Sequence, residues 1–484
     1  MTSIFNRLKN SSKDVKASTA YVICSVIQKC LSLITLPIFA RILTTEEFGV
    51  STVYASTMAV VIIFTTLNLP YGSFSTAMMK FEKDRAGYVS AVNMICIMFS
   101  VLYFIVYFIF MDFWNGLASL PTELMVLMGF EMLFNTAILL WMGKSRFEYK
   151  YISFVVVTLI MSVLGTSCSI LAVIFLQDKG TVKVLANGVV VCIIGIVILV
   201  CSLFRGKACF KKEYWKYALS FNIPLIPYYF SQIIFNQSDR LMINKMIGKG
   251  DAALYGVAYT LAFVLTFVLN AINNSFVPWM YRKIKENKLQ ENKKISIIIA
   301  AVMAVLLLGI IALAPEIILI MAGEQYTSAI WVVPPVAMSL LLLFYSQLFI
   351  NVEFYFEEKY KLVWASVLAA LANIVLNYFG IAMFGFVAAG YTTLISYILF
   401  AVCNYIAMKK VCKNKGVDSN LYDIKTLVLL FIAFVLIGFI FAALYPFRYV
   451  RIGIIVVGFA LVLIFRNKIL SLGKNVMHTI KSKD

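Results

Sequence analysis

Long apolar runs separated by short polar segments make up nearly the whole chain. An α-helix needs about 20 apolar residues to cross a bilayer, and the runs have this length. They predict an all-α polytopic membrane protein with about fourteen transmembrane helices. The predicted spans are residues 17–43, 48–79, 86–111, 123–143, 151–176, 184–204, 217–247, 252–277, 295–320, 329–352, 362–383, 386–408, 424–444 and 449–465.

Four of these spans, the first, second, seventh and eighth, are longer than a bilayer requires. We expect them to tilt or bend, and Pro70, Pro224 and Pro227 provide positions where a helix can break. Residues 1–16 are polar and basic with apolar side chains on one side. That pattern is typical of a short helix lying in the plane of the membrane.

The basic residues lie unevenly on the two sides of these spans. If the N-terminus is cytoplasmic, the cytoplasmic segments carry 33 Lys and Arg residues, and the outer ends and loops carry 7. Cytoplasmic loops are enriched in Lys and Arg, so this asymmetry predicts that both termini are cytoplasmic. The seven outer positions are Arg41, Lys179, Lys183, Lys245, Lys249, Arg448 and Arg451.

The seventh span carries an unusual polar stripe. Tyr228, Gln232, Asn236 and Asp239 follow one another at helical spacing, and Arg240 is adjacent. A charge at the bilayer centre costs about 2.5–3.5 kcal/mol even on the insertion scale, so the stripe must face protein or water. Two interpretations remain open: neighbouring helices satisfy the charges, or the stripe borders a polar lumen that crosses the membrane.

Other spans contain polar residues at helical spacing. Lys29 lies on one face of the first span with Ser18, Ser25 and Ser32, and Glu131 lies one turn before Asn135 in the fourth. Ionisable residues inside a membrane are usually functional, which favours a role for Lys29, Glu131, Asp239 and Arg240. The paired Asn373 and Asn377 are typical of hydrogen bonds between helices, and Glu316 and Glu353, at helix ends, are expected to be solvated.

Composition narrows the function further. The chain has 62% hydrophobic and 13% charged residues, whereas soluble domains have about 25% charged residues. Its net charge of +19 comes from short clusters between spans, a pattern of orientation signals and lipid-headgroup contacts rather than of nucleic-acid binding. Nine cysteines and one histidine show no metal-ligand spacing, and there is no Walker motif or catalytic carboxylate pair. We expect no metal, no cofactor and no enzymatic activity.

Two segments of the chain are similar to each other. Residues 40–55 read ARILTTEEFGVSTVYA and residues 244–259 read NKMIGKGDAALYGVAY. Each has a cationic residue near the end of a helix, a short acidic turn, and an aromatic-Gly-Val sequence that opens the next helix. This indicates a parallel internal repeat, an arrangement found in transporters that bind substrate between their two halves.

Three motifs carry a resemblance to a known family. LPIFARILTTEEFGV at residues 36–50, SDRLMI at 238–243 and YGVAYTLA at 255–262 resemble the polysaccharide-export flippases. These are the Wzx-type O-antigen transporters of the multidrug/oligosaccharidyl-lipid/polysaccharide (MOP) superfamily. The resemblance implies two six-helix lobes in a V-shaped, MATE-like arrangement plus two C-terminal helices. The implied divisions are residues 1–210, 211–416 and 417–484.

The same resemblance implies a function. Such proteins move undecaprenyl-diphosphate-linked oligosaccharides across the bacterial cytoplasmic (inner) membrane by alternating access, with coupling to a proton or sodium gradient. The partners implied are the lipid-linked oligosaccharide, membrane lipids, a polysaccharide polymerase and a chain-length regulator, with no nucleic acid. Substrate-binding candidates are Lys29, Arg240, Gln232, Asn236, Arg41 and Lys245, and ion-coupling candidates are Asp239 and Glu131.

The sequence leaves three alternatives open. A cation-coupled multidrug exporter of the same superfamily would favour an aromatic and acidic cavity, and Lys29 and Arg240 argue against it. A lipid II flippase of that superfamily is harder to distinguish from an oligosaccharide flippase. An enzyme such as a membrane polymerase or glycosyltransferase would need a large outer loop or a cytoplasmic catalytic domain, which the spacing of the spans does not provide.

Overall fold

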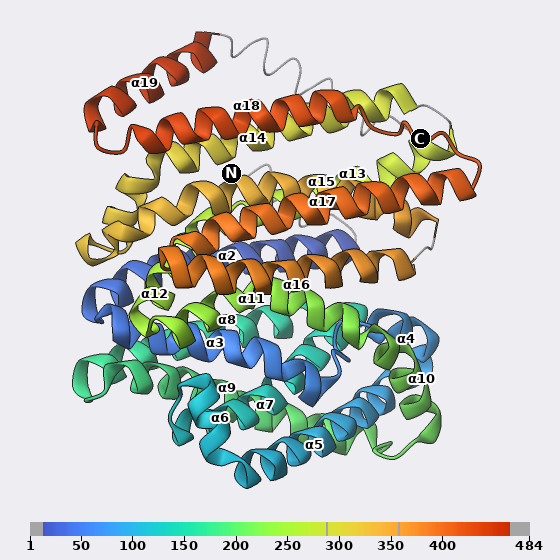
Figure 1. Ribbon diagram of the computed structural model, residues 1–484. Helices are drawn as coiled ribbons and strands as arrows, with labels where there is room; N and C mark the ends of the chain where they lie inside the picture. Colours follow the sequence, from blue (N-terminus) through green and yellow to red (C-terminus); the bar gives the residue numbers. More distant parts are fainter. Residues whose placement is uncertain (1–12, 287–288, 357–358, 465–484) are drawn as a thin grey trace, which may run out of the picture. The chain divides into compact units, whose positions relative to one another are not determined.

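The computed structural model describes residues 13–286, 289–356 and 359–464. Every regular element in these residues is an α-helix or a 3-10 helix (Figure 1), which confirms the all-α class. The in-plane helix predicted for residues 1–16 falls mostly outside the described residues, as does the basic C-terminal tail. The chain divides into two compact units, Met1–Ala253 and Leu254–Asp484.

The first unit contains a long series of helices. They are α2 (Lys13–Ile42), α3 (Thr45–Thr66), α4 (Phe74–Lys80), η1 (Glu82–Asp84), α5 (Arg85–Ile109), α6 (Met111–Ala118), α7 (Thr122–Phe147), α8 (Tyr151–Phe175), α9 (Lys179–Gly206), α10 (Lys212–Asn222), η2 (Ile223–Leu225) and α11 (Ile226–Met246). The division between the units falls within α12 (Lys249–Phe263).

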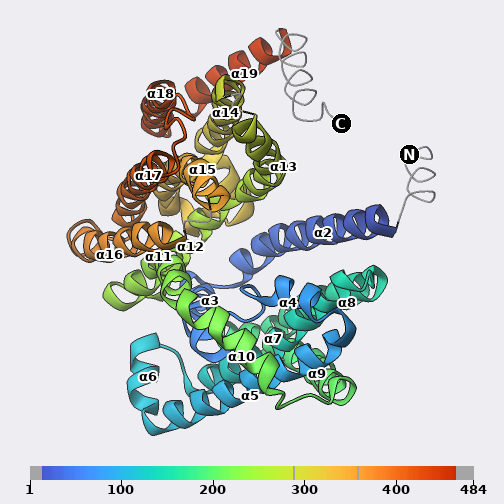
Figure 2. The ribbon, with the colours of Figure 1, turned by 90° about the vertical axis from the view of Figure 1, so that its right-hand side faces the viewer.

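The second unit continues from α12. Its further helices are α13 (Thr266–Lys285), α14 (Leu289–Met321), η3 (Glu324–Val332), α15 (Val333–Tyr355), α16 (Lys359–Phe384), α17 (Ala388–Asn414), α18 (Ile424–Ala443) and α19 (Arg448–Ile464). Figure 2 shows α15 at the centre of this unit, surrounded by α13, α14 and α17, and most of α15 is buried.

Among the described residues, twelve helical segments are long and apolar enough to cross a membrane. They match the first six predicted spans and the eighth to the thirteenth. The seventh predicted span corresponds to α11, which has 21 residues but is more polar than the others because of its stripe. The last corresponds to α19, which has 17 residues. The protein is therefore a multi-pass membrane protein by length and composition.

The expected break points are confirmed at the prolines. The second span stops as a helix at Thr66, and Leu67 and Asn68 adopt left-handed conformations before the segment that contains Pro70. The seventh span is interrupted by η2, which contains Pro224 and separates α10 from α11. The eighth span also breaks, between α12 and α13, although no proline lies at that point.

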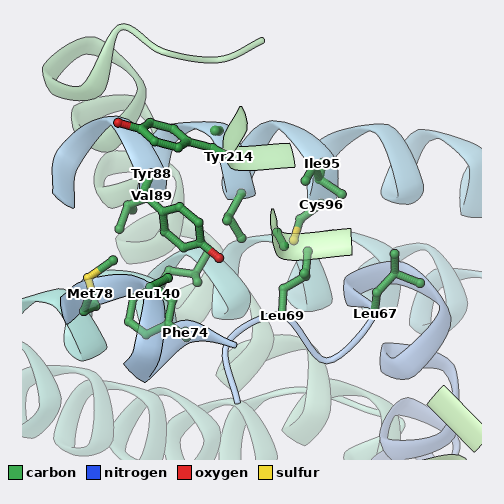
Figure 3. Close-up of a cluster of buried hydrophobic side chains, with 14 residues drawn as sticks. Leu67, Leu69, Phe74, Met78, Tyr88, Val89, Ile95, Cys96, Leu140 and Tyr214 are labelled. Carbon is green, nitrogen blue, oxygen red and sulfur yellow. The ribbon is translucent and has the colours of Figure 1, made fainter. Parts of the chain in front are cut away.

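A cluster of aromatic and aliphatic side chains fixes α10 against α4 and α5. Phe74, Tyr88 and Tyr214 belong to this buried cluster (Figure 3). The Tyr214 hydroxyl donates a hydrogen bond of 2.6 Å to Asp84, and burial together with this bond raises the pKa of Tyr214. The amide of Asn222, the last residue of α10, donates to the Ser73 hydroxyl at 2.8 Å. These contacts fix the segment that leads into α11.

Buried polar groups in the second unit bond with one another. The Asn377 amide donates to the Asn373 carbonyl oxygen at 3.1 Å, and the Thr392 hydroxyl donates to Asn377. The expectation that Glu316 is solvated was wrong, since Arg451, which is only 1% exposed, donates to its carboxylate. Glu353 is also buried rather than solvated. Helix packing buries Glu353 and leaves the Glu316 side chain 20% exposed beside Arg451, and their positions near helix ends could not reveal this.

Candidate functional site

A cavity of about 370 Å³ lies within the first unit. It is bordered by α2, α3, α7, α8 and α9. Nine of its fifteen lining residues are polar. The polar lining residues are Ser32, Thr35, Ser51, Tyr54, Glu131, Thr166, Ser169, Lys183 and Asn187, and the apolar ones are Leu36, Phe39, Phe48, Ala55, Met58 and Val184.

Local sequence signals position α3 and α9, which supply Ser51, Tyr54 and Lys183 to the wall. Thr44 caps α3 through a reciprocal pair of hydrogen bonds with Glu47, of 3.2 and 2.8 Å. This fixes where α3 begins and places Ser51 and Tyr54 on its second and third turns. Helix α9 packs closely on α7 because Gly195 has no side chain: a Cβ there would lie 2.5 Å from the Phe134 Cβ.

Glu131 is a buried carboxyl group on α7, with 8% of its surface exposed. Its Oε2 accepts a hydrogen bond of 2.7 Å from the hydroxyl of Tyr54, which is itself 5% exposed. The pair therefore joins α3 to α7 at the wall of the cavity.

Lys183 is the cation of this cavity. Its ammonium donates a hydrogen bond of 2.9 Å to the Ser51 hydroxyl. It also lies 4.1 Å from the ring centre of Phe48 and 4.5 Å from that of Phe39. Among the described residues, no acidic side chain forms an ion pair with Lys183. Aromatic faces and one hydroxyl thus hold a charge that a carboxylate usually balances.

The predicted residues of the first helix lie on exposed surface. Lys29 and Arg41 are both exposed on α2, the latter in its last turn. Helix α2 packs on α8, where Gln28 donates to the Ser162 hydroxyl at 3.2 Å. One turn after Lys29, Ser32 reaches the cavity wall. The polar face of α2 therefore includes both an exposed cation and a cavity residue.

The predicted residues of the seventh span all lie on α11. Asp239 is 1% exposed, and Arg240 donates to the side chain of Gln237 at 2.8 Å. The Asn236 amide donates to the carbonyl of Gln232 at 2.7 Å, one turn earlier. At the far end, the exposed Lys245 donates to the carbonyl of Gly116 in α6 at 2.9 Å. This last bond links α11 to α6.

Of the eight predicted site residues, Glu131 lines the cavity and the other seven do not. Sequence reasoning did not find Tyr54, Ser51 or Lys183. Lys183 was assigned to an outer loop because the sixth span was expected to begin at residue 184, whereas α9 begins at Lys179. Had the sixth span been predicted to begin at Lys179, Lys183 would have been placed inside it.

The two similar turns found in the sequence lie against each other. The backbone of Gly49, in the second turn of α3, contacts the backbone of Lys249 at the start of α12. A Cβ on Gly250 would lie 2.9 Å from the Glu46 carboxylate. Gly49 is therefore a position where two backbones approach too closely for any side chain. The repeat itself stays a prediction.

Comparison with known proteins identifies the family. The family described as "Polysaccharide biosynthesis protein" matches residues 15–283, more than half of the chain. An uncharacterized membrane protein of Haemophilus influenzae is 20% identical over 379 residues, covering 74% of this chain and 88% of that protein.

Two solved structures share the fold. The lipid II flippase MurJ, in an inward closed conformation, matches with a TM-score of 0.63 and 15% identity, over 93% of this chain and 99% of that chain. An inward-facing multidrug resistance MATE family transporter of the MOP superfamily matches with a TM-score of 0.60 and 12% identity, over 83% and 99%. The fold is that of MOP-superfamily transporters, and the chain belongs to the polysaccharide biosynthesis protein family.

Proposed function

We propose that the protein is a flippase for undecaprenyl-diphosphate-linked oligosaccharides, such as the repeat units of O-antigen, capsule or exopolysaccharide. It would carry them across the bacterial inner membrane by alternating access of its lobes, with both termini in the cytoplasm. The observation that carries this proposal is α11, a helix of membrane length with Asp239 and Arg240 in its interior among much more apolar helices. Ionisable residues inside a membrane usually face a polar cavity and mark substrate pathways, which supports a lumen for a charged lipid headgroup.

The proposed roles follow from charge and geometry. Lys29 and Arg240 would bind the diphosphate, because ammonium and guanidinium groups pair strongly with phosphate oxygens. Arg41 and Lys245 would add positive charge nearer the outer ends. Gln232 and Asn236 would bind polar groups of the substrate. Their six positions on α2 and α11 belong to the first unit.

Coupling to an ion gradient is the second part of the proposal. Asp239 and Glu131 are buried carboxyl groups in helices of membrane length, and buried carboxyl groups can bind a proton or a cation during transport. The lobes at residues 1–210 and 211–416, with two additional helices at 417–484, would provide the moving parts. A polysaccharide polymerase and a chain-length regulator would use the flipped product.

The test uses Lys29→Ala and Arg240→Ala in cells that depend on this protein for surface polysaccharide. Each variant should reduce surface polysaccharide by about tenfold or more, since each removes a charged hydrogen-bond donor to the diphosphate. Arg240→Lys should retain part of the activity, because it keeps the charge but loses the bidentate geometry. Membrane abundance of each variant is measured in parallel.

Lys179→Ala is the matched control, since it removes one outer lysine that does not belong to the proposed site, and it should export normally. Wild-type export by both alanine variants at normal abundance would contradict the proposal. Rescue of a cell that lacks its lipid II flippase would favour lipid II as the substrate instead. Asp239→Asn separates two roles: mild loss indicates that Asp239 only positions Arg240, and complete loss indicates ion coupling.

A further inference from the structure

Lys183 has hydrogen-bonding capacity that the protein does not use. An ammonium group has three N–H donors and no acceptor. One donor reaches Ser51, and the faces of Phe39 and Phe48 lie beside the group. No carboxylate among the described residues pairs with it. Because Lys183 lines the cavity, its remaining donors are available to a ligand there.

The rest of the wall fits a ligand rich in hydroxyl groups. Asn187 lies one turn after Lys183 on the same helix, and Thr166 and Ser169 come from α8. The Ser169 hydroxyl already donates to the Lys183 carbonyl at 3.0 Å, which fixes the two helices relative to each other. The volume of about 370 Å³ is in the range of sites for small organic molecules.

The charge of the wall selects the type of anion. Lys183 supplies one positive charge, and Glu131, held by Tyr54, lies in the same wall. A dianionic phosphate would meet one cation and one carboxyl group, whereas the phosphate sites of proteins usually contain arginine or several cations. A single carboxylate matches a single ammonium group.

We propose that this cavity binds the carboxylate-bearing ring of an acidic sugar, with Lys183 pairing with the carboxylate. Asn187, Thr166 and Thr35 bind the ring hydroxyls. The identification of the ligand as part of the transported oligosaccharide rests on the proposed function, but binding of the acidic sugar in the cavity does not. The transported oligosaccharide then contains a uronic acid or a similar acidic residue.

The experiment measures equilibrium binding to the purified full-length protein in phosphatidylcholine nanodiscs. The probes are glucuronate, its neutral isostere glucuronamide, and inorganic phosphate. Wild-type protein should bind glucuronate at least about tenfold more tightly than glucuronamide, since a charge-assisted pair is lost with the amide. It should also prefer glucuronate to phosphate.

Three substitutions locate the site. Lys183→Met keeps the length of the side chain and should abolish the preference for glucuronate over glucuronamide. Lys179→Met makes the same change one turn earlier on α9, outside the cavity wall, and should leave the preference unchanged. Lys183→Arg keeps the charge and should retain most of the preference, which guards against a folding defect in the methionine variant.

Three results would overturn the proposal: equal binding of glucuronate and glucuronamide by wild-type protein, tighter binding of phosphate, or a preference that survives in a folded Lys183→Met variant. Failure here is distinct from failure of the flippase function. Arg240 lies outside the cavity wall, so the Arg240→Ala variant should lose export while it still binds glucuronate. An intact flippase without glucuronate binding would refute only the cavity site.

Discussion

The two units contain buried polar groups of different kinds. In the first unit, Glu131 and Lys183 line a cavity, and each is held by a neighbouring hydroxyl rather than by an opposite charge. In the second unit, Arg451 pairs directly with Glu316, and Asn377 bonds within a buried cluster. Paired groups contribute to specificity and stability, whereas a cation that retains unused donors beside a cavity can bind a ligand.

This difference predicts that substitutions in the two regions have separable effects. Changes in the buried pairs of the second unit should lower stability and leave ligand binding unchanged. Changes at Lys183 should alter ligand binding with little loss of stability, because Lys183 contacts one hydroxyl and two aromatic faces.

The largest effect is expected for Arg451→Met in the second unit. Arg451 is 1% exposed and donates to Glu316, so its removal leaves a partly buried carboxylate without its closest cation. Breaking a buried pair costs about 3 kcal/mol or more. Denaturant unfolding in detergent should show a loss of this size, with export reduced only as far as abundance falls.

Arg448→Met is the control for this prediction. Arg448 lies 3.8 Å from the same carboxylate, but its side chain is 64% exposed. Exposed ion pairs contribute about 1 kcal/mol or less, so this variant should be close to wild type. If the two substitutions lowered stability equally, the buried Arg451 would contribute no more than the exposed Arg448. Buried pairs would then not stabilise the second unit.

The next effect is expected for Tyr54→Phe in the first unit. It removes the hydroxyl that donates to Glu131 at 2.7 Å, and loss of a donor to a buried acceptor costs about 1–3 kcal/mol. In a Glu131→Leu background the same substitution should cost much less, which gives a coupling energy of about 1 kcal/mol or more. Both variants and the double variant are compared by unfolding in detergent.

Tyr103→Phe provides the reference for Tyr54→Phe. The Tyr103 hydroxyl donates to the backbone carbonyl of Met125 at 2.9 Å, which is a neutral bond in the same unit. It should cost about 1 kcal/mol and show no coupling to Glu131. If Tyr54→Phe is additive with Glu131→Leu, the hydroxyl and the carboxyl group do not act as a pair.

The helix order, the fold class and the break points could be predicted because they depend on local sequence. Apolar runs of membrane length give the spans, and Pro70 and Pro224 mark positions where a helix cannot continue. The polar stripe of α11 was equally visible, since Gln232 and Asn236 recur at helical spacing. Each of these signals lies within one segment and needs no knowledge of packing.

The cavity could not be predicted, because five helices form it. Tyr54 and Glu131 lie 77 positions apart, and Lys183 and Ser51 lie 132 apart. No periodicity within one helix indicates which of its polar residues meets a partner on another. Glu316 was misjudged for the same reason: its partner Arg451 is 135 positions away. Tertiary packing, rather than position within a helix, decides which of these charges are buried.

The smallest effect is expected for Thr392→Val in the cluster of the second unit. The Thr392 hydroxyl donates to the side-chain oxygen of Asn377, which is buried with Asn373. The substitution removes this donor, so the buried oxygen loses a hydrogen bond. The expected cost is about 1 kcal/mol, read as a small shift in the unfolding midpoint.

Thr260→Val is the control, because that exposed hydroxyl bonds only to the Gly256 carbonyl of its own helix, at 2.7 Å. Its loss should be close to zero, since the Gly256 carbonyl keeps the backbone N–H of its own helix as a donor. Glucuronate binding should be unchanged in both variants. A Thr392→Val variant with wild-type stability and altered glucuronate binding would reverse the comparison, because the cluster would then respond to ligand rather than support the fold.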